Sequence, residues 1–200
     1  QQGRASRFVV TRQPTQHVHR APQACPAQGA QQRLCAFQQR KADLDEPLRE
    51  MAVSAILYTL APGDVIPDTS GAVGYLDDAL ALRVVLDAIR AKSEARFESY
   101  HDRIPDLAAS AGEDLDVFRE ALGDELYEAF VARVGSDKNE FKGKRARELI
   151  TSDDGPAWLD EEVSLAALKL DFKPAAVQAA ARKAATVPQM FRQKLQPTRR

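Results

Sequence analysis

Residues 62–78 read PGDVIPDTSGAVGYLDD, a polar stretch that lies between two apolar segments of the chain. The stretch holds four carboxylates, Asp64, Asp68, Asp77 and Asp78, and its Pro-Gly and Pro-Asp pairs are typical of turns. The apolar residues on both sides recur at helical spacing. The pattern therefore predicts a helical hairpin and, with the rest of the chain, an all-α fold of a hairpin plus additional short helices and an extended basic N-terminal arm.

The two helices of this hairpin have clear start and stop signals. Asp45 is the expected N-cap of the first, with Pro47 in its first turn, and Pro62-Gly63 ends it. The second is predicted to run from about Asp77 to Ser99. Its core-facing residues are expected to be Leu80, Val84, Ile89 and Phe97, and its water-facing ones Arg83, Arg90, Lys92 and Glu94.

The four carboxylates have two interpretations. In the first, Asp64 and Asp68 accept hydrogen bonds from backbone N–H groups in turns, and Asp77 and Asp78 stabilise a helix N-terminus. In the second, the loop folds back so that two or more of them bind calcium or magnesium, although their spacing is not that of an EF-hand. The first is favoured, and no catalytic or cofactor-binding residue is predicted.

The same stretch resembles a known pattern: a tyrosine-bearing apolar helix, Pro-x-Asp-x-Ile-Pro-Asp, then Gly-Tyr-Leu-Asp-Asp and a second apolar helix. Tyr58 to Leu82, YTLAPGDVIPDTSGAVGYLDDALAL, is similar in this way to the YkvA-like family, a domain of unknown function (DUF1232). The matching hairpin-motif residues are Pro62, Asp64, Ile66, Pro67, Asp68, Gly74, Tyr75, Leu76, Asp77 and Asp78. The resemblance implies a small helical hairpin without an established reaction, often regarded as membrane-associated in bacterial members.

Charge is strongly segregated along the chain. Residues 1–40 contain six arginines and no acid, and residues 172–200 contain seven Lys or Arg and no acid. The middle therefore carries 15 basic residues and all 29 acids, a formal charge of −14. Basic ends on an acidic body indicate contact with acidic partners: protein surfaces, anionic lipid or rRNA.

The first forty residues have a composition unlike the rest. They contain ten glutamines and few, scattered apolar residues, so they are not expected to bury a core. An acid-free, Arg-bearing segment resembles a mitochondrial or plastid transit peptide or its remnant. We therefore expect residues 1–42 to be an extended basic arm, residues 43–110 the hairpin domain, and residues 111–200 a helical region with a basic tail.

Membrane spans and small chemical sites find little support in the sequence. The longest apolar run, residues 51–62, is shorter than the roughly 20 residues that a bilayer span needs. Cys25 and Cys35 are expected to be free thiols, with a bridging pair as the alternative. The imidazoles of His17 and His19 lack further ligands for a metal, and His101 is expected to cap a helix.

Further helices are expected downstream. The pattern of residues 113–135 predicts two short helices broken near Gly123. The pattern of residues 137–150 predicts a helix with a solvated face, and the alternative is a patch that binds nucleic acid. The basic cluster of that segment is Lys142, Lys144, Arg145 and Arg147. A helix should follow Gly155-Pro156, with Trp158 in the core and Asp160, Glu161 and Glu162 near its N-terminus. Pro188 should kink or end a final Ala-rich helix.

No phosphate loop, nucleophile elbow or dinucleotide fingerprint is present, so a non-enzymatic role without cofactor or small-molecule substrate is predicted. We expect an accessory, structural subunit of a large organellar assembly, with a mitochondrial respiratory-chain or ATP-synthase complex favoured. Its partners would be other protein subunits. The expected location is mitochondrial, on the inner membrane or matrix side, with a plastid as the alternative. The competing hypotheses are an organellar ribosome subunit and a peripheral membrane-surface protein of bacterial type.

Overall fold

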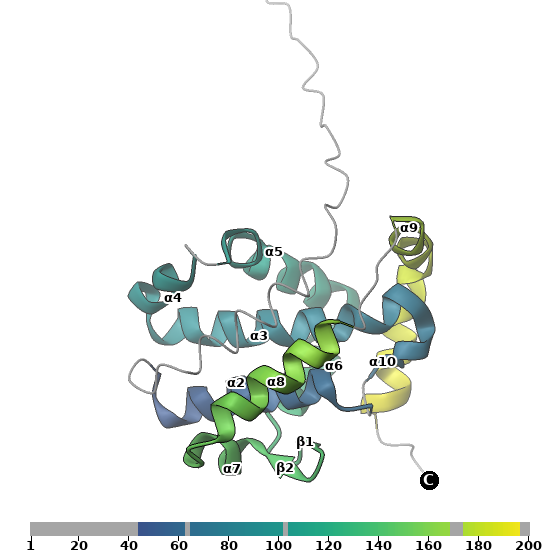
Figure 1. Ribbon diagram of the computed structural model, residues 1–200. Helices are drawn as coiled ribbons and strands as arrows, with labels where there is room; N and C mark the ends of the chain where they lie inside the picture. Colours follow the sequence, from purple (N-terminus) through teal and green to yellow (C-terminus); the bar gives the residue numbers. More distant parts are fainter. Residues whose placement is uncertain (1–43, 63–64, 102–103, 169–173, 197–200) are drawn as a thin grey trace, which may run out of the picture.

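The protein is described by a computed structural model that covers residues 44–62, 65–101, 104–168 and 174–196 (Figure 1). Within these ranges the fold is mostly helical, which confirms the predicted all-α class. The α-helices are α2 (Glu46–Leu60), α3 (Leu76–Lys92), α4 (Glu94–His101), α5 (Pro105–Leu122), α6 (Asp124–Val134), α7 (Ala146–Thr151), α8 (Gly155–Ala167), α9 (Pro174–Lys183) and α10 (Val187–Leu195). The 3₁₀ helices are η1 (Asp68–Tyr75) and η2 (Ala184–Thr186), and the strands are β1 (Glu140–Phe141) and β2 (Lys144–Arg145). The predicted arm, residues 1–42, lies outside the described residues.

The hairpin of α2 and α3 is the centre of the molecule. Asp45 caps α2 as predicted, since its carboxylate accepts a hydrogen bond from the Leu48 N–H at 3.2 Å. The chain returns through η1 into α3, and α3 packs along α2 (Figure 1). Both helices contribute residues that are almost fully buried, such as Ile56 and Val85. The predicted helical hairpin is therefore confirmed.

The second helix of the hairpin is shorter than predicted. It ends at Lys92, because Ser93 adopts an extended conformation and its hydroxyl accepts a hydrogen bond from the Arg96 N–H at the start of α4. The predicted core residues Leu80, Val84, Ile89 and Phe97 are all buried. Arg83, which was expected to face water, instead bonds Asp114 of α5 at 2.6 Å and retains only 15% side-chain exposure.

The helices after the hairpin continue the same core. α5 begins at Pro105, eight residues before the predicted start at residue 113, because proline is well suited to the first turn of a helix. The predicted break at Gly123 is confirmed, with φ at +81° separating α5 from α6. The expected border between residues 110 and 111 falls inside α5, and the hydrophobic core is continuous across it.

The basic segment 137–150 was predicted as one helix, and this was wrong. Its middle forms an antiparallel ribbon in which Glu140 pairs with Arg145 and Phe141 with Lys144. The two connecting residues, Lys142 and Gly143, both have positive φ, +48° and +78°, as a tight two-residue hairpin turn requires. Of the four predicted basic residues, only Arg147 lies in a helix, α7.

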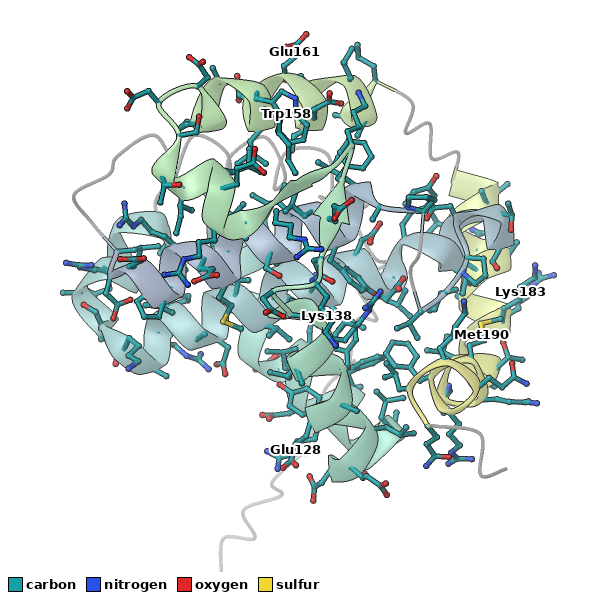
Figure 2. The ribbon with its side chains drawn as sticks, turned by 90° about the horizontal axis from the view of Figure 1, so that it is seen from below. Glu128, Lys138, Trp158, Glu161, Lys183 and Met190 are labelled. Carbon is teal, nitrogen blue, oxygen red and sulfur yellow. The ribbon has the colours of Figure 1, made fainter. Side chains whose placement is uncertain are left out.

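α8 corrects two further predictions. Figure 2 shows Trp158 pointing from α8 toward the body and Glu161 pointing away from it. Trp158 is half-buried against Phe141, at 6.3 Å between ring centroids, whereas Leu159 and Val163 supply the fully buried contacts. Because α8 begins at Gly155, its acidic residues lie beyond its first turn and do not stabilise its N-terminus.

The C-terminal helices are docked on the body as far as Gln196. Pro188 lies in the first turn of α10, just after the helical break at η2, so the predicted interruption of the Ala-rich helix is confirmed. Phe191 of α10 is fully buried, with its ring centroid 5.1 Å from that of Phe118 and 5.3 Å from that of Phe130. Such edge-to-face packing anchors α10 to α5 and α6.

A buried polar cluster ties the hairpin to the β-ribbon. The Ser54 hydroxyl on α2 has one proton, which lies between two acceptors, the backbone oxygens of Val134 at 2.9 Å and Ser136 at 2.7 Å. The Asn139 amide contacts the Ser54 hydroxyl at 3.0 Å and the Val134 carbonyl oxygen at 2.9 Å. Satisfied polar groups of this kind fix one arrangement of neighbouring elements. These hydrogen bonds fix the position of the ribbon against α2.

Candidate functional site

The loop between α2 and α3 is closed around the carboxylate of Asp77. This side chain is fully buried, and its Oδ2 accepts hydrogen bonds from the Tyr58 hydroxyl at 2.7 Å, the Val65 N–H at 3.0 Å and the Ile66 N–H at 3.1 Å. Asp77 lies in the first turn of α3 as predicted, but these partners belong to α2 and the loop. We call this arrangement of Tyr58, Val65, Ile66 and Asp77 the loop lock.

Burial shapes the ionisation of Asp77. Desolvation raises the pKa of its carboxyl above the ordinary 3.8, and the hydrogen bonds from Tyr58 and the loop oppose that rise. A buried charge is tolerated only when several donors surround it. The loop lock therefore has a structural role, because it holds the Asp77 carboxyl inside the core and away from solvent.

Gly74 brings the two ends of η1 together. A Cβ atom at this position would lie 2.7 Å from both the Asp68 Cα and the Pro67 carbonyl oxygen, so only glycine permits the approach. η1 also contains a kink at Gly71, whose φ is +78°. This folding places Asp68, at the start of η1, on the same side as Tyr75 at its end.

A cleft of about 380 Å³ opens between the hairpin motif and α8 with its neighbouring β-ribbon. Its polar lining comes from Thr59, Asp68, Tyr75, Asp78, Lys142 and Glu162. Its apolar lining comes from Leu60, Pro62, Phe141, Leu165 and Ala166. Volumes of this size fall within the range of small binding sites in proteins. The cleft thus joins three motif residues to a wall that lies far downstream in the sequence.

The downstream wall is held by an ion pair. The Lys142 ammonium lies 2.6 and 2.8 Å from the two carboxylate oxygens of Glu162. Glu162 keeps only 11% side-chain exposure, whereas Lys142, at the tip of the ribbon, keeps 56%. Lys142 occupies the first position of the two-residue turn, and its side chain reaches from there to Glu162 of α8. We call this pair the α8 wall.

The opposite wall of the cleft, which consists of Asp68, Tyr75 and Asp78 and which we call the motif wall, has a phenol close to two carboxylates. Burial raises the pKa of the Tyr75 phenol above 10.0, and the charges of Asp68 and Asp78 raise it further. Both carboxylates therefore act on the same hydroxyl, which stays protonated at neutral pH and can donate a hydrogen bond. The described lining of the cleft holds three carboxylates and one ammonium group, and the Glu162 carboxylate is paired with that ammonium group.

The predicted site residues thus separate into groups. Asp68 and Asp78 line the cleft, Asp77 belongs to the loop lock, and Asp64 lies outside the described residues. Across residues 44–62, 65–101, 104–168 and 174–196, no three His, Cys, Asp or Glu side chains are grouped to hold a metal ion. The second interpretation, in which the loop carboxylates bind calcium or magnesium, stays a prediction, because Asp64 lies outside the described residues.

Other candidates have simple placements. His101 is exposed at the last residue of α4, where a cation is favourable to the helix dipole. His17, His19, Cys25 and Cys35 lie outside the described residues. The sequence analysis did not predict the pairing of Lys142 with Glu162. The only local signal was the Lys142-Gly143 pair, which forms the turn of the ribbon. No helix in the described part of the chain is both long and apolar enough to cross a membrane.

These features define a helical-hairpin domain set within a larger helical body. Residues 49–83 match the family model described as "Protein of unknown function (DUF1232)", so the chain carries a DUF1232 domain there. The match spans most of α2, all of η1 and the first half of α3, and confirms the resemblance seen in the sequence. No curated protein and no solved structure matches the chain significantly.

Proposed function

We propose that the protein is a non-catalytic accessory subunit of a large assembly, and that it works by docking on other protein subunits. The observation that carries the proposal is the separation of charge on the folded body. α5 and α6 expose the acids Glu113, Asp116, Glu120, Glu125 and Glu128 beside two arginines, Arg119 and Arg133. α9 and α10 expose Arg182, Lys183, Arg192 and Lys194.

These two faces are distinct in space. Figure 2 shows Glu128 of α6 and Lys183 of α9 projecting from different sides of the molecule. Separate faces of opposite charge act as independent binding surfaces, because salt screens charges beyond roughly 8–10 Å. A subunit with two such faces can bridge neighbours of unlike charge and steer their encounter.

The cleft also favours binding over catalysis. The Lys142 ammonium and the Glu162 carboxylate, which would serve as acid and base in a catalytic site, bond each other at 2.6 Å. The other carboxylates of the cleft face a phenol that stays protonated at neutral pH. This arrangement offers charge and hydrogen bonds to a ligand, and it supports a docking role for the motif wall.

We infer the organelle in this proposal from the amino-acid composition of the N-terminal segment. Residues 1–40 combine six arginines with no acid, as in segments that direct import into mitochondria or plastids. We favour a mitochondrion, on the inner membrane or matrix side, and a respiratory-chain or ATP-synthase complex. A plastid or an organellar ribosome would suit the same composition.

The test is gradient fractionation of the source material with mass spectrometry for this chain. We expect co-migration with a megadalton complex, and co-migration lost in a Lys183→Glu, Lys194→Glu variant. The matched control reverses two exposed cations elsewhere, Lys138→Glu with Arg147→Glu, and should keep the complex. Migration of the unchanged protein near its own 22.0 kDa would reject the proposal.

A second candidate function rests on the same basic face. Four exposed cations on two successive helices could bind anionic lipid, each contributing about 1 kcal/mol near such a surface. The protein would then be a peripheral membrane-surface protein. Flotation with phosphatidylserine-containing vesicles distinguishes the two: salt-sensitive binding that the Lys183→Glu, Lys194→Glu variant loses favours the membrane, and its absence favours the assembly.

A further inference from the structure

We propose that the exposed face of α9 is a docking surface for a second copy of this chain, and that it contacts the acidic face of α5 in that copy. The inference names a partner for the two charged faces, so it rests on the docking role proposed above. The contact joins unlike surfaces of two identical chains and needs no other protein.

The exposed cations of α9 and α10 have no acidic neighbour in their own part of the chain. Arg182, Lys183, Arg192 and Lys194 are exposed, and residues 172–200 contain no acid. Figure 2 shows Lys183 pointing away from the body. Among the residues that the structure describes, none of these four cations forms an ion pair. Their charge is therefore available to an acidic partner.

The complementary surface lies on α5. Glu113, Asp116 and Glu120 recur at spacings of three and four residues, which places them on one exposed face of the helix. Within the described ranges, none of the three is in an ion pair. Arg119, which is next to them in the sequence, bonds Asp124 at 2.5 Å, so its charge is already compensated. α5 thus offers three carboxylates to a basic partner.

The shapes of the two faces are also suited to each other. On α9, Ala175 and Ala179 lie one turn apart on the exposed side, and Arg182 follows them on the same side. Small side chains let a second helix approach closely, because the distance between helix axes depends on the residues at the contact. Val117 lies among the acids of α5 and is 69% exposed. Its side chain would pack over the two alanines, between the charged groups.

The two faces do not meet within one chain. α9 packs on η1, and the charges of α9 and α5 stay unpaired in the described structure although both helices belong to the same body. A contact between two copies leaves a basic face free on one copy and an acidic face free on the other. Such a contact between unlike surfaces can therefore repeat head to tail.

A second copy matches more of the surface than an anionic membrane does. Anionic lipid would attract the cations of α9 and α10, but it would repel the carboxylates of α5. A second copy uses both faces, and each of its own faces is the complement of the other. Charge complementarity therefore favours the second copy as the occupant.

The test is sedimentation equilibrium of the purified full chain. At low ionic strength we expect an average mass above the 22.0 kDa of the single chain, and it should rise with protein concentration. Added salt should lower this mass toward that of the single chain, because salt screens contacts between exposed charges. A mass that stays near 22.0 kDa at every concentration overturns the inference and leaves the gradient test of the larger assembly unaffected.

Charge-reversal variants locate the contact. Glu113→Lys with Glu120→Lys on α5 should weaken the association several-fold, and so should Arg182→Glu with Lys183→Glu on α9. An equimolar mixture of the two variants should associate again, because the unchanged α9 of the first meets the unchanged α5 of the second. Recovery in the mixture would also show that both variants are folded. A mixture of two folded variants that stays monomeric overturns the proposal.

Matched controls carry the same changes of charge on other faces. Glu148→Lys with Glu161→Lys, on α7 and α8, matches the α5 variant, and Lys138→Glu with Arg147→Glu matches the α9 variant; all four residues are exposed. Both controls should associate as the natural chain does. Association that the controls lose as readily, or that the α5 and α9 variants keep, would show that the contact lies elsewhere and would overturn the proposal.

Discussion

The loop lock and the α8 wall are two hydrogen-bonded arrangements of nearly equal length with opposite surroundings. Tyr58 donates to the Asp77 carboxylate at 2.7 Å, and Lys142 lies 2.6 Å from the Glu162 carboxylate. Both carboxylates are largely buried, since Asp77 is fully buried and Glu162 keeps 11% side-chain exposure, but the Lys142 side chain is 56% exposed. Contact distance therefore does not separate the two arrangements, and the exposure of the donor does.

Burial determines the cost of losing a partner. In the loop lock, the Tyr58 hydroxyl and the Val65 and Ile66 N–H groups would lose their common acceptor inside the core, where an unsatisfied polar group costs about 1–3 kcal/mol. In the α8 wall, the freed ammonium group turns to water at little cost, as exposed ion pairs contribute only about 0–1 kcal/mol. The loop lock should thus govern folding, and the α8 wall the electrostatics of the cleft.

The largest expected effect is that of Asp77→Ala. The variant leaves Tyr58, Val65 and Ile66 without their common acceptor, so the free energy of unfolding should fall by roughly 2–5 kcal/mol. Urea denaturation followed by circular dichroism measures this loss. The control Asp77→Asn keeps an acceptor oxygen and should lose clearly less. Equal losses in both variants would mean that the hydrogen bonds do not stabilise the loop.

Gly74→Ala should have the next largest effect. The added methyl group would lie 2.7 Å from backbone atoms of Pro67 and Asp68, which cannot move as a flexible side chain could. Forced packing of this kind costs about 1–3 kcal/mol. Thermal unfolding should show a lower midpoint. Ala substitution at Gly135, where the nearest atoms lie 3.7 Å away, is the control and should change the midpoint little.

A pH titration tests the loop lock in a different way. Because the pKa of Asp77 is raised in the folded protein, the folded state holds its proton more tightly than the unfolded state does. The contribution of this group to stability is most favourable below pH 3.8 and is lost as the pH rises through the raised pKa. The free energy of unfolding of the natural protein, relative to Asp77→Asn, should therefore decrease over that interval. A relative increase would show that the hydrogen bonds outweigh burial and lower the pKa.

The parts of the fold that the sequence predicted well were those with strong local signals. Asp45 as an N-cap, the Pro62-Gly63 stop and the break at Gly123 each depend on the chemistry of one or two residues. The hairpin needed only the periodicity of two apolar segments. Ser93 carried a similar local signal, since serine favours helix starts, but the apolar pattern on both sides concealed it.

The candidate site depended on contacts that no local pattern encodes. Asp77 and Asp78 are neighbours with similar sequence surroundings, yet one faces the loop and the other lines the cleft. The α8 wall joins residues 142 and 162, which lie far apart in the sequence. The two strands of the ribbon that carries Lys142 are too short to show a period of two. Tertiary packing alone brings these groups together, so the sequence predicted the carboxylates but not their separate roles.

The smallest expected effect comes from the α8 wall, and a double-mutant cycle measures it. The free energy of unfolding is compared among the natural protein, Lys142→Met, Glu162→Gln and the double variant. We expect a coupling energy of about 0.5–1 kcal/mol, because water competes for the exposed Lys142 ammonium. A coupling energy above roughly 2 kcal/mol would place the α8 wall beside the loop lock as a determinant of folding, because pairs of that strength are largely shielded from water.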